Sequence, residues 1–283
     1  MNDERTFSSA EKLDDLSEKQ KHEVADRSRP NAALIHETIR AEGESELDRG
    51  SLALVCSGLS AGLSIGFSLV VQGELYSRLS AGAVRDLVSP LGYTIGFLIV
   101  IVGRQQLFTE NTLTPVLALF HNRDPSTMWR VLRLWAIVLV TNVVGAILFA
   151  VALAHSTVFE PNVVSAFVEL ARQSVRADFG VTLIRGIYAG WLIALMVWLL
   201  PASQYSRPLI ILIITYIVGL CGFAHVIAGS VDCAFLVEFG QATWSDFFSR
   251  FFEPTLLGNI VGGVALVAAL NYGQVAAEIE GHG

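Results

Sequence analysis

The stretch RQQLFTEN, residues 104–111, interrupts one of the most apolar regions of the chain. It follows IGFLIVIVG (95–103) and precedes LTPVLALF (113–120). An arginine, two glutamines, a glutamate and an asparagine are costly in hydrocarbon, because each polar group there needs a partner. The stretch therefore predicts a break between two half-helices inside a membrane, with non-helical backbone that is buried in protein or lines a watery cavity.

The composition is that of a membrane protein. Of the 283 residues, 53% are hydrophobic and only 16% are charged, whereas soluble domains carry charge on roughly a quarter of their residues. Charge is concentrated in residues 1–50, which hold 8 of the 19 Lys and Arg residues and 13 of the 26 Asp and Glu residues. Because this tail accounts for most of the net charge of −7, we expect the lipid bilayer and no nucleic acid as a partner.

Six membrane elements are predicted from the apolar runs, since about 20 such residues cross a bilayer. Two of the runs, 87–120 and 208–236, are each too long for one helix and too short for two, and the second is interrupted between Gly222 and Gly229. The predicted fold is therefore an all-α membrane protein with broken second and fifth helices. The other four elements are continuous and are expected at 51–72, 134–154, 181–202 and 255–273.

The two halves of the chain contain similar motifs in the same order. GLSAG (58–62) in the first span matches GIYAG (186–190) in the fourth, and NVVG (142–145) in the third matches NIVG (259–262) in the sixth. Most of these glycines also have a simpler role, which is to let helix backbones approach closely. Two repeats of three spans enter the membrane in opposite senses, so the sequence predicts an inverted pair whose broken helices meet near the midplane.

Arginine density predicts the orientation of the chain. Arginines are denser in loops 121–133 and 203–207 than in the loops of the opposite side, which places both termini in the cytoplasm. We therefore expect three parts: a charged cytoplasmic tail at 1–50 with a polar helix near 31–49, a six-span transport domain at 51–273, and a short cytoplasmic tail at 274–283.

The breaks carry the residues of most chemical interest. His225 is the only histidine within a span, and an ionisable group inside a membrane is a functional candidate, because burying it is costly. Histidine can exchange a proton near neutral pH, although a structural hydrogen-bonding role is the alternative. Half-helix N-termini that point at the midplane also suit an anion. Since no nucleophile–base pair or metal-ligand cluster is present, we expect neither an enzyme nor a metal site.

Three sets of residues resemble a known family: Leu107-Phe108-Thr109 at the first break, Gly222-Phe223-Ala224-His225 at the second, and GNIVGG (258–263) in the last span. Over roughly residues 50–273 the chain resembles the formate/nitrite transporter family. It is most similar to the poorly characterised inner-membrane branch in which the first break reads GRQQLFTENTLTP, here residues 103–115.

The resemblance implies an aquaporin-like protomer and a homopentamer in the bacterial inner membrane, with one pore per protomer and no cofactor. The protein would act as a channel or a proton-coupled carrier for small monovalent weak-acid anions such as formate or nitrite. Leu107 and Phe108 would form an apolar constriction, and His225 would assist protonation of the anion. Thr109 and Asn259 would be its hydrogen-bonding neighbours, with Phe223 also lining the pore. A neutral acid then crosses with much less dehydration cost than its anion.

The chain departs from the family pattern at several positions. Residues 51–283 contain no lysine, so Arg172 or Arg176 would replace the usual vestibule lysine. Val218 stands where the resemblance leads us to expect an aromatic lining residue. Arg104 and Glu110 add charges at the first break, and we expect them to pair with each other, with a neighbouring protomer or with Asp232, either as an inert structural pair or as a gate.

Two other functions remain open at this level. A channel for neutral small solutes fits the architecture, but the Asn-Pro-Ala motifs that such pores usually carry are missing. A non-transporting membrane scaffold or sensor is the other alternative, in which the charged tail is the working part and Arg104 and Glu110 plug the pore.

Overall fold

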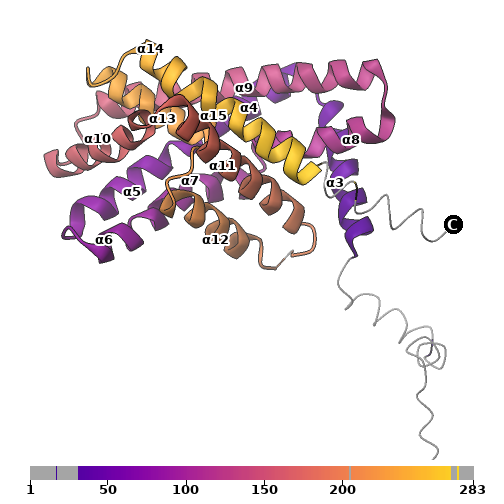
Figure 1. Cartoon of the computed structure of the whole chain (residues 1–283), viewed down its shortest axis with the longest axis horizontal. Helices are drawn as coiled ribbons and strands as arrows, with labels where there is room; N and C mark the ends of the chain where they lie inside the picture. Colours follow the sequence, from indigo (N-terminus) through magenta and orange to yellow (C-terminus); the bar gives the residue numbers. More distant parts are fainter. Residues whose placement is uncertain (1–16, 18–30, 204, 269–272, 274–283) are drawn as a thin grey trace, which may run out of the picture.

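The computed structural model describes residues 17, 31–203, 205–268 and 273, which form helices and connecting turns without any strand (Figure 1). The expected C-terminal tail at 274–283 and most of residues 1–30 lie outside the described residues. Four helical stretches are long and apolar enough to cross a membrane, at Ser51–Arg78, Ala83–Val102, Pro125–Ala154 and Phe179–Leu199.

The first half of the chain contains one helix before the spans and then three membrane elements. Its second element is broken, as the sequence predicts, between α7 and α8. The helices are α3 (Ala32–Leu47), α4 (Ser51–Ile65), α5 (Phe67–Arg78), α6 (Ala83–Val88), α7 (Pro90–Val102), the short 3-10 turn η1 (Glu110–Thr112), α8 (Thr114–Asn122) and α9 (Pro125–Ala154).

The second half follows the same plan. Its broken element consists of α12 and α13. The interruption between them lies before Gly229, within the predicted region. The helices are α10 (Pro161–Arg176), α11 (Phe179–Leu199), α12 (Arg207–Leu220), α13 (Val226–Glu238), α14 (Trp244–Asp246), the π-helical η2 (Phe247–Phe252), α15 (Glu253–Ile260) and the π-helical η3 (Val261–Ala268).

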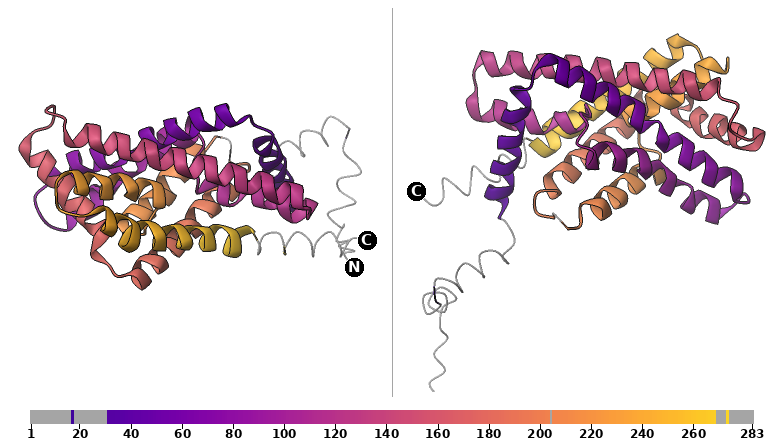
Figure 2. Two further views of the ribbon diagram at one scale, coloured as in Figure 1. Left: turned by 90° about the horizontal axis from the view of Figure 1, so that it is seen from above. Right: turned by 180° about the vertical axis from the view of Figure 1, so that it is seen from behind.

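The third span and the segment that follows it differ from the expected elements. The third span begins nine residues early, at Pro125, because Asp124 caps the helix through hydrogen bonds from the backbone of Ser126 and Thr127. Figure 2 shows the resulting long helix α9 running along most of the molecule. The segment after it is a helix, α10, where the sequence suggested only a loop. Its apolar face is buried against α5 and α13. With 16 residues and apolar side chains on one face only, α10 lacks the roughly 20 apolar residues that indicate a membrane span.

The inverted repeat is visible in the packing. In the first half α4 packs on α9 and α3 packs on α8, and in the second half α11 packs on α15 and α10 packs on α13. Both α3 and α10 have 16 residues. Figure 1 places α3 and α10 at opposite ends of the bundle, as an inversion requires.

The matched glycines lie where the helices of each repeat touch. A side chain at Gly62 would overlap the backbone of Asn142, and a side chain at Gly190 would overlap the backbone of Asn259. Glycine lets the two helix backbones approach closely at both positions. The matched pairs seen in the sequence are therefore the same contact, made once in each repeat.

Both breaks begin with the same backbone turn. Arg104 has φ 51° and Gly222 has φ 62°, so each lies in the left-handed region that ends many helices. The next N–H reaches back in the same way, from Gln105 to the Val100 carbonyl and from Phe223 to the Val218 carbonyl, at 3.0 Å in both cases. Arg104 and Gly222 are thus equivalent positions, and arginine adopts there a conformation that glycine adopts without strain.

Candidate functional site

Two buried asparagines hold the two breaks in place. Asn142 on α9 accepts a hydrogen bond from the Phe108 N–H at 2.9 Å, and its amide donates to the carbonyls of Gly58 and Gln106. Its side chain therefore ties the first break to α4 and α9. All of these groups are buried, so each hydrogen bond satisfies a backbone group that water cannot reach.

Asn259 makes the same three bonds in the second repeat. It accepts from the Val226 N–H at 2.9 Å and donates to the carbonyls of Gly186 and Ala224. Asn259 therefore holds the backbone around His225 and forms no hydrogen bond to the imidazole itself. Asn259 is thus a hydrogen-bonding neighbour of His225 through the backbone on either side of it, and the side chain bonded to the imidazole in the described part of the chain is Thr109.

The two breaks meet at Thr109 and His225. The Thr109 hydroxyl oxygen lies 2.7 Å from His225 Nε2, and both residues are buried. The Ala228 N–H donates to His225 Nδ1 at 3.2 Å, so the ring also caps α13. Because Nδ1 is an acceptor, the ring proton of the neutral imidazole lies on Nε2 and is donated to Thr109. The hydroxyl hydrogen of Thr109 is then free to point at another acceptor.

Apolar side chains surround this pair. The edge of Phe97 on α7 meets the His225 ring at a centroid distance of 4.8 Å. Leu107 and Phe108 are both buried, and Phe108 packs edge-on against Trp135. Val218 is buried near the end of α12. The Thr109–His225 pair is therefore a polar contact within a buried and largely apolar region.

Phe223 faces a different neighbour. Its ring stacks on Tyr188 of α11 at 5.1 Å and an interplanar angle of 20°. Tyr188 is exposed, so this stack lies toward the outer side of the chain. The contribution of Phe223 to a pore remains a prediction.

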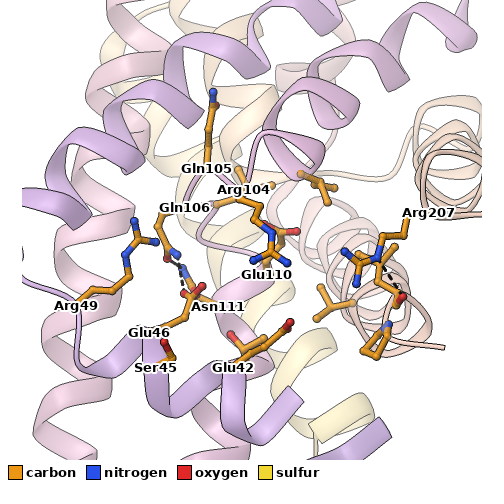
Figure 3. A pocket seen from close by; sticks show the side chains of 16 residues that line it. Glu42, Ser45, Glu46, Arg49, Arg104, Gln105, Gln106, Glu110, Asn111 and Arg207 are labelled. Carbon is orange, nitrogen blue, oxygen red and sulfur yellow. Dashed lines mark hydrogen bonds between the residues drawn. The ribbon is translucent and has the colours of Figure 1, made fainter. Parts of the chain in front are cut away.

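A cavity of about 450 Å³ opens beside the first break (Figure 3). Leu107, two residues before Thr109 in the chain, lines it. Its other walls come from α3, the break itself, α11 and the start of α12, so helices from both repeats enclose it. The charged residues that line the cavity are Glu42, Glu46, Arg49, Arg104, Glu110 and Arg207.

A chain of hydrogen bonds ties α3 to the break. Gln106 donates to Glu46 Oε2 at 2.7 Å, as Figure 3 shows, and it accepts from the Asn111 amide at 2.8 Å. The Trp135 indole N–H donates to the Asn111 carbonyl at 2.8 Å. Glu46 is half-buried, and burial raises the pKa of its carboxyl, an effect that the hydrogen bond from Gln106 partly opposes.

The expected ion pair at the first break is absent. Arg104 and Glu110 line the same cavity, but neither is within 4.0 Å of an opposite charge in the part of the chain that the structure describes. Asp232 is on α13, beyond His225, where the Ser174 hydroxyl of α10 donates to its carboxylate at 3.1 Å. Asp232 does not line the cavity, so the expected pairing of Arg104 or Glu110 with it is wrong, as is their pairing with each other. Pairing with a neighbouring protomer stays a prediction.

The two candidate vestibule arginines lie at the α10 end of the bundle, opposite the cavity. Arg172 donates to Gln241 at 2.9 Å and pairs with Glu169 at 3.3 Å, and Arg176 is exposed at the end of α10. The sequence did not identify the cavity residues of α3 and α12, because their side chains meet only after both repeats have folded together. The paired glutamines in RQQ were the available signal, since polar groups in a membrane need partners.

Comparison with known proteins gives a consistent result. The family model described as formate/nitrite transporter matches residues 33–273. The chain is 39% identical over 250 residues to inner membrane protein YfdC of Escherichia coli, covering 88% of this chain and 81% of that protein. It is 28% identical to formate channel BtFdhC of Bacillus thuringiensis, covering 82% and 91%.

The fold is that of a solved structure described as a pentameric formate channel with formate bound. The two superpose with a TM-score of 0.68 at 20% identity, covering 78% of this chain and 96% of that one. The predicted all-α architecture with broken second and fifth helices is confirmed by this likeness.

Proposed function

Because the chain belongs to the formate/nitrite transporter family, we propose that it forms a membrane pore for small monovalent weak-acid anions such as formate or nitrite. The Thr109–His225 pair carries the proposal, since it is a buried polar contact where two broken helices meet. The names of a formate channel among its relatives and of a formate-bound structure among its structural neighbours support this substrate class.

The proposed route begins in the 450 Å³ cavity. Arg49, Arg104 and Arg207 offer guanidinium groups to an incoming anion there. Leu107 then separates the cavity from the buried pair and strips water from the solute. A charged anion pays a large desolvation penalty at this point, so passage as the neutral acid is favoured.

Within the constriction the role of His225 is to orient and polarise a donor. Its Nε2–H donates to the Thr109 oxygen, which leaves the Thr109 O–H free to donate to an oxygen of the solute. Two hydrogen bonds in series strengthen each other in dry surroundings. The solute therefore finds one polar contact between the apolar side chains of Leu107 and Phe97.

A homopentamer with both termini in the cytoplasm is the proposed assembly. The solved structure with the same fold is described as pentameric, and large apolar side chains are exposed along α4, α9 and α11, where lipid or a neighbouring protomer would cover them. The arginine-rich loops on the α3 side favour the cytoplasm for that end. Examples of the exposed side chains are Leu52, Val140, Leu148 and Ile184.

The test is formate and nitrite flux into proteoliposomes that contain the purified protein. We expect His225→Asn to lower the flux at least about tenfold, and Thr109→Val to lower it as well, because both changes remove the serial hydrogen bonds. His155→Asn is the matched control, since His155 is exposed at the end of α9. Flux in His225→Asn equal to that of wild type would contradict the proposal. Osmotic swelling with a neutral solute that is unchanged in both His225→Asn and Thr109→Val would favour a neutral-solute channel.

A further inference from the structure

The position of the ring proton on His225 raises the question of where the solute obtains its proton. Nδ1 accepts from the Ala228 N–H, so the single ring proton on Nε2 is the only one available. Donating that proton outright would leave an imidazolate anion in a buried, apolar site, which is prohibitively costly. Protonating Nδ1 first would break the cap of α13. A different group is therefore needed to exchange the proton.

Glu110 is placed to do this on the cavity side. It follows Thr109 directly in the chain and lines the cavity together with Leu107. Figure 3 shows its side chain within the ring of cavity residues. No cation lies within 4.0 Å of its carboxyl group in the described part of the chain. An acid without an ion-pair partner remains able to take up and release a proton.

Asp232 occupies a comparable place on the other side of the pair. It lies seven residues after His225 on α13, so the two residues share one face of that helix, two turns apart. Phe97, which touches His225, also packs against Tyr93, one turn earlier on α7. Tyr93 thus follows Phe97 along α7, and Asp232 follows His225 along α13.

The repeat gives an independent reason to place Asp232 along the pore. The backbone N–H groups of Phe108 and Val226 donate equivalent hydrogen bonds to the two asparagines. Thr114 and Asp232 each lie six residues further on. Thr114 lines the cavity with Ser45 of α3, and Asp232 is bonded to Ser174 of α10. Ser45 and Ser174 are the fourteenth residues of their 16-residue helices. Asp232 therefore stands where the inverted repeat places the opposite vestibule.

Other charged groups surround both carboxyls. The cavity side holds Glu42, Glu46, Arg49, Arg104 and Arg207. On the other side α10 carries Arg176 as well as the Glu169–Arg172 pair, and α13 ends with Glu238. Near this end Glu74 pairs with Arg78 on α5, and Asp246 of α14 pairs with Arg250 of η2. No charged residue lies between Thr109 and Glu110, or between His225 and Asp232, in the sequence.

We propose that Glu110 and Asp232 are the proton-exchanging residues on the two sides of the constriction, an inference that rests on the proposed transport of weak acids. On one side the O–H bond of the carboxylic acid breaks, and its proton bonds to the anion to give a neutral acid and a carboxylate. The neutral acid passes Thr109 and His225. On the other side it returns the proton to the second carboxylate, and the anion leaves. Hydronium in the first compartment then protonates the first carboxylate again, and the second carboxylic acid gives its proton to water in the second compartment.

The chemistry of the partners suits this exchange. Formate is a carboxylate, so a proton moves between it and an Asp or Glu side chain with little change in free energy, because the two acids are of similar strength. Such matched acidity is what general acid–base catalysis requires. One anion and one proton cross together, and His225 stays neutral throughout.

The experiment measures formate uptake and internal acidification together in proteoliposomes, over a range of external pH. Glu110→Gln and Asp232→Asn keep shape but cannot exchange a proton, and we expect each to lower coupled uptake at least about tenfold and to flatten its pH profile. Glu160→Gln, at the exposed start of α10 and outside the cavity, should transport within about twofold of wild type. Asp232→Glu, which restores the acid, should do the same. Gel filtration of each variant verifies that assembly is intact.

The outcomes separate this inference from the proposed function. Wild-type flux that His225→Asn abolishes, combined with unchanged rates and pH profiles in Glu110→Gln or Asp232→Asn, would overturn the carboxyl pair and leave the pore intact. Equal losses in Asp232→Asn and Asp232→Glu would also overturn it, because geometry and not proton exchange would then be at stake. Wild-type liposomes without flux would refute the proposed function itself.

Discussion

Removing the Asn259 side chain tests the architecture most directly. Asn259→Ala leaves the Val226 N–H and the carbonyls of Gly186 and Ala224 without their side-chain partner. Asn259 is fully buried, so water cannot replace those bonds. Each unpaired buried group costs about 1–3 kcal/mol, although the Gly186 carbonyl keeps a partner within its helix, and the expected loss of unfolding free energy is therefore about 3–5 kcal/mol.

The assay is reversible unfolding of the purified protein in mixed micelles, followed by tryptophan fluorescence. Asn142→Ala should lose a similar amount, because Asn142 makes the mirror-image bonds to Phe108, Gly58 and Gln106. Asn122→Ala, at the exposed end of α8, should change stability by no more than about 0.5 kcal/mol. A loss below about 1 kcal/mol for Asn259→Ala, or a difference above about 2 kcal/mol between the two buried asparagines, would refute the reasoning.

Two further predictions concern the cavity. Arg104→Gly should raise the unfolding free energy by about 0.5–1 kcal/mol, because glycine adopts the φ of 51° without strain, and the same titration would contradict this if stability fell. Burial raises the pKa of Glu46, so docked α3 binds this proton more tightly than undocked α3, and docking weakens as pH rises above the ordinary glutamate value. Amide exchange in α3, corrected for intrinsic rates, should therefore quicken as pH rises above the ordinary glutamate value, and Glu46→Gln should abolish the change while keeping a hydrogen bond to Gln106. Exchange that is unchanged in wild type would show that Glu46 does not control docking.

The sequence predicted the broken helices because polar residues inside an apolar run have few structural solutions. Arg104 to Asn111 could not continue a lipid-facing helix, and the second interruption carried both a left-handed glycine and a buried histidine. The repeat was predictable for a related reason. Close helix packing needs glycine, and the hydrogen bonds that hold each break need the asparagine side chain, so both residues recur in each half.

The parts that were missed depend on contacts between distant segments. Helix α10 is short and amphipathic, and its pattern acquires meaning only against α5 and α13. The charges at the first break were expected to pair. In the structure Arg104 lies in the left-handed turn that ends α7, whereas Glu110 lies at the start of η1, and the two do not form an ion pair. A sequence shows which charges are near in the chain, but the orientation of a break decides which of them face one another.

The repeat also shows how a symmetric scaffold gives an asymmetric constriction. The asparagines hold Phe108 and Val226 in equivalent positions, so the residues just before them, Leu107 and His225, are equivalent as well. One repeat thus presents an apolar side chain where the other presents an imidazole. Two histidines would have to share protons in a dry space, while two leucines would leave a solute without a polar contact. A single imidazole with Thr109 as its partner avoids both outcomes. This explains why the equivalent hydrogen bonds of the two asparagines position a leucine in one repeat and a histidine in the other.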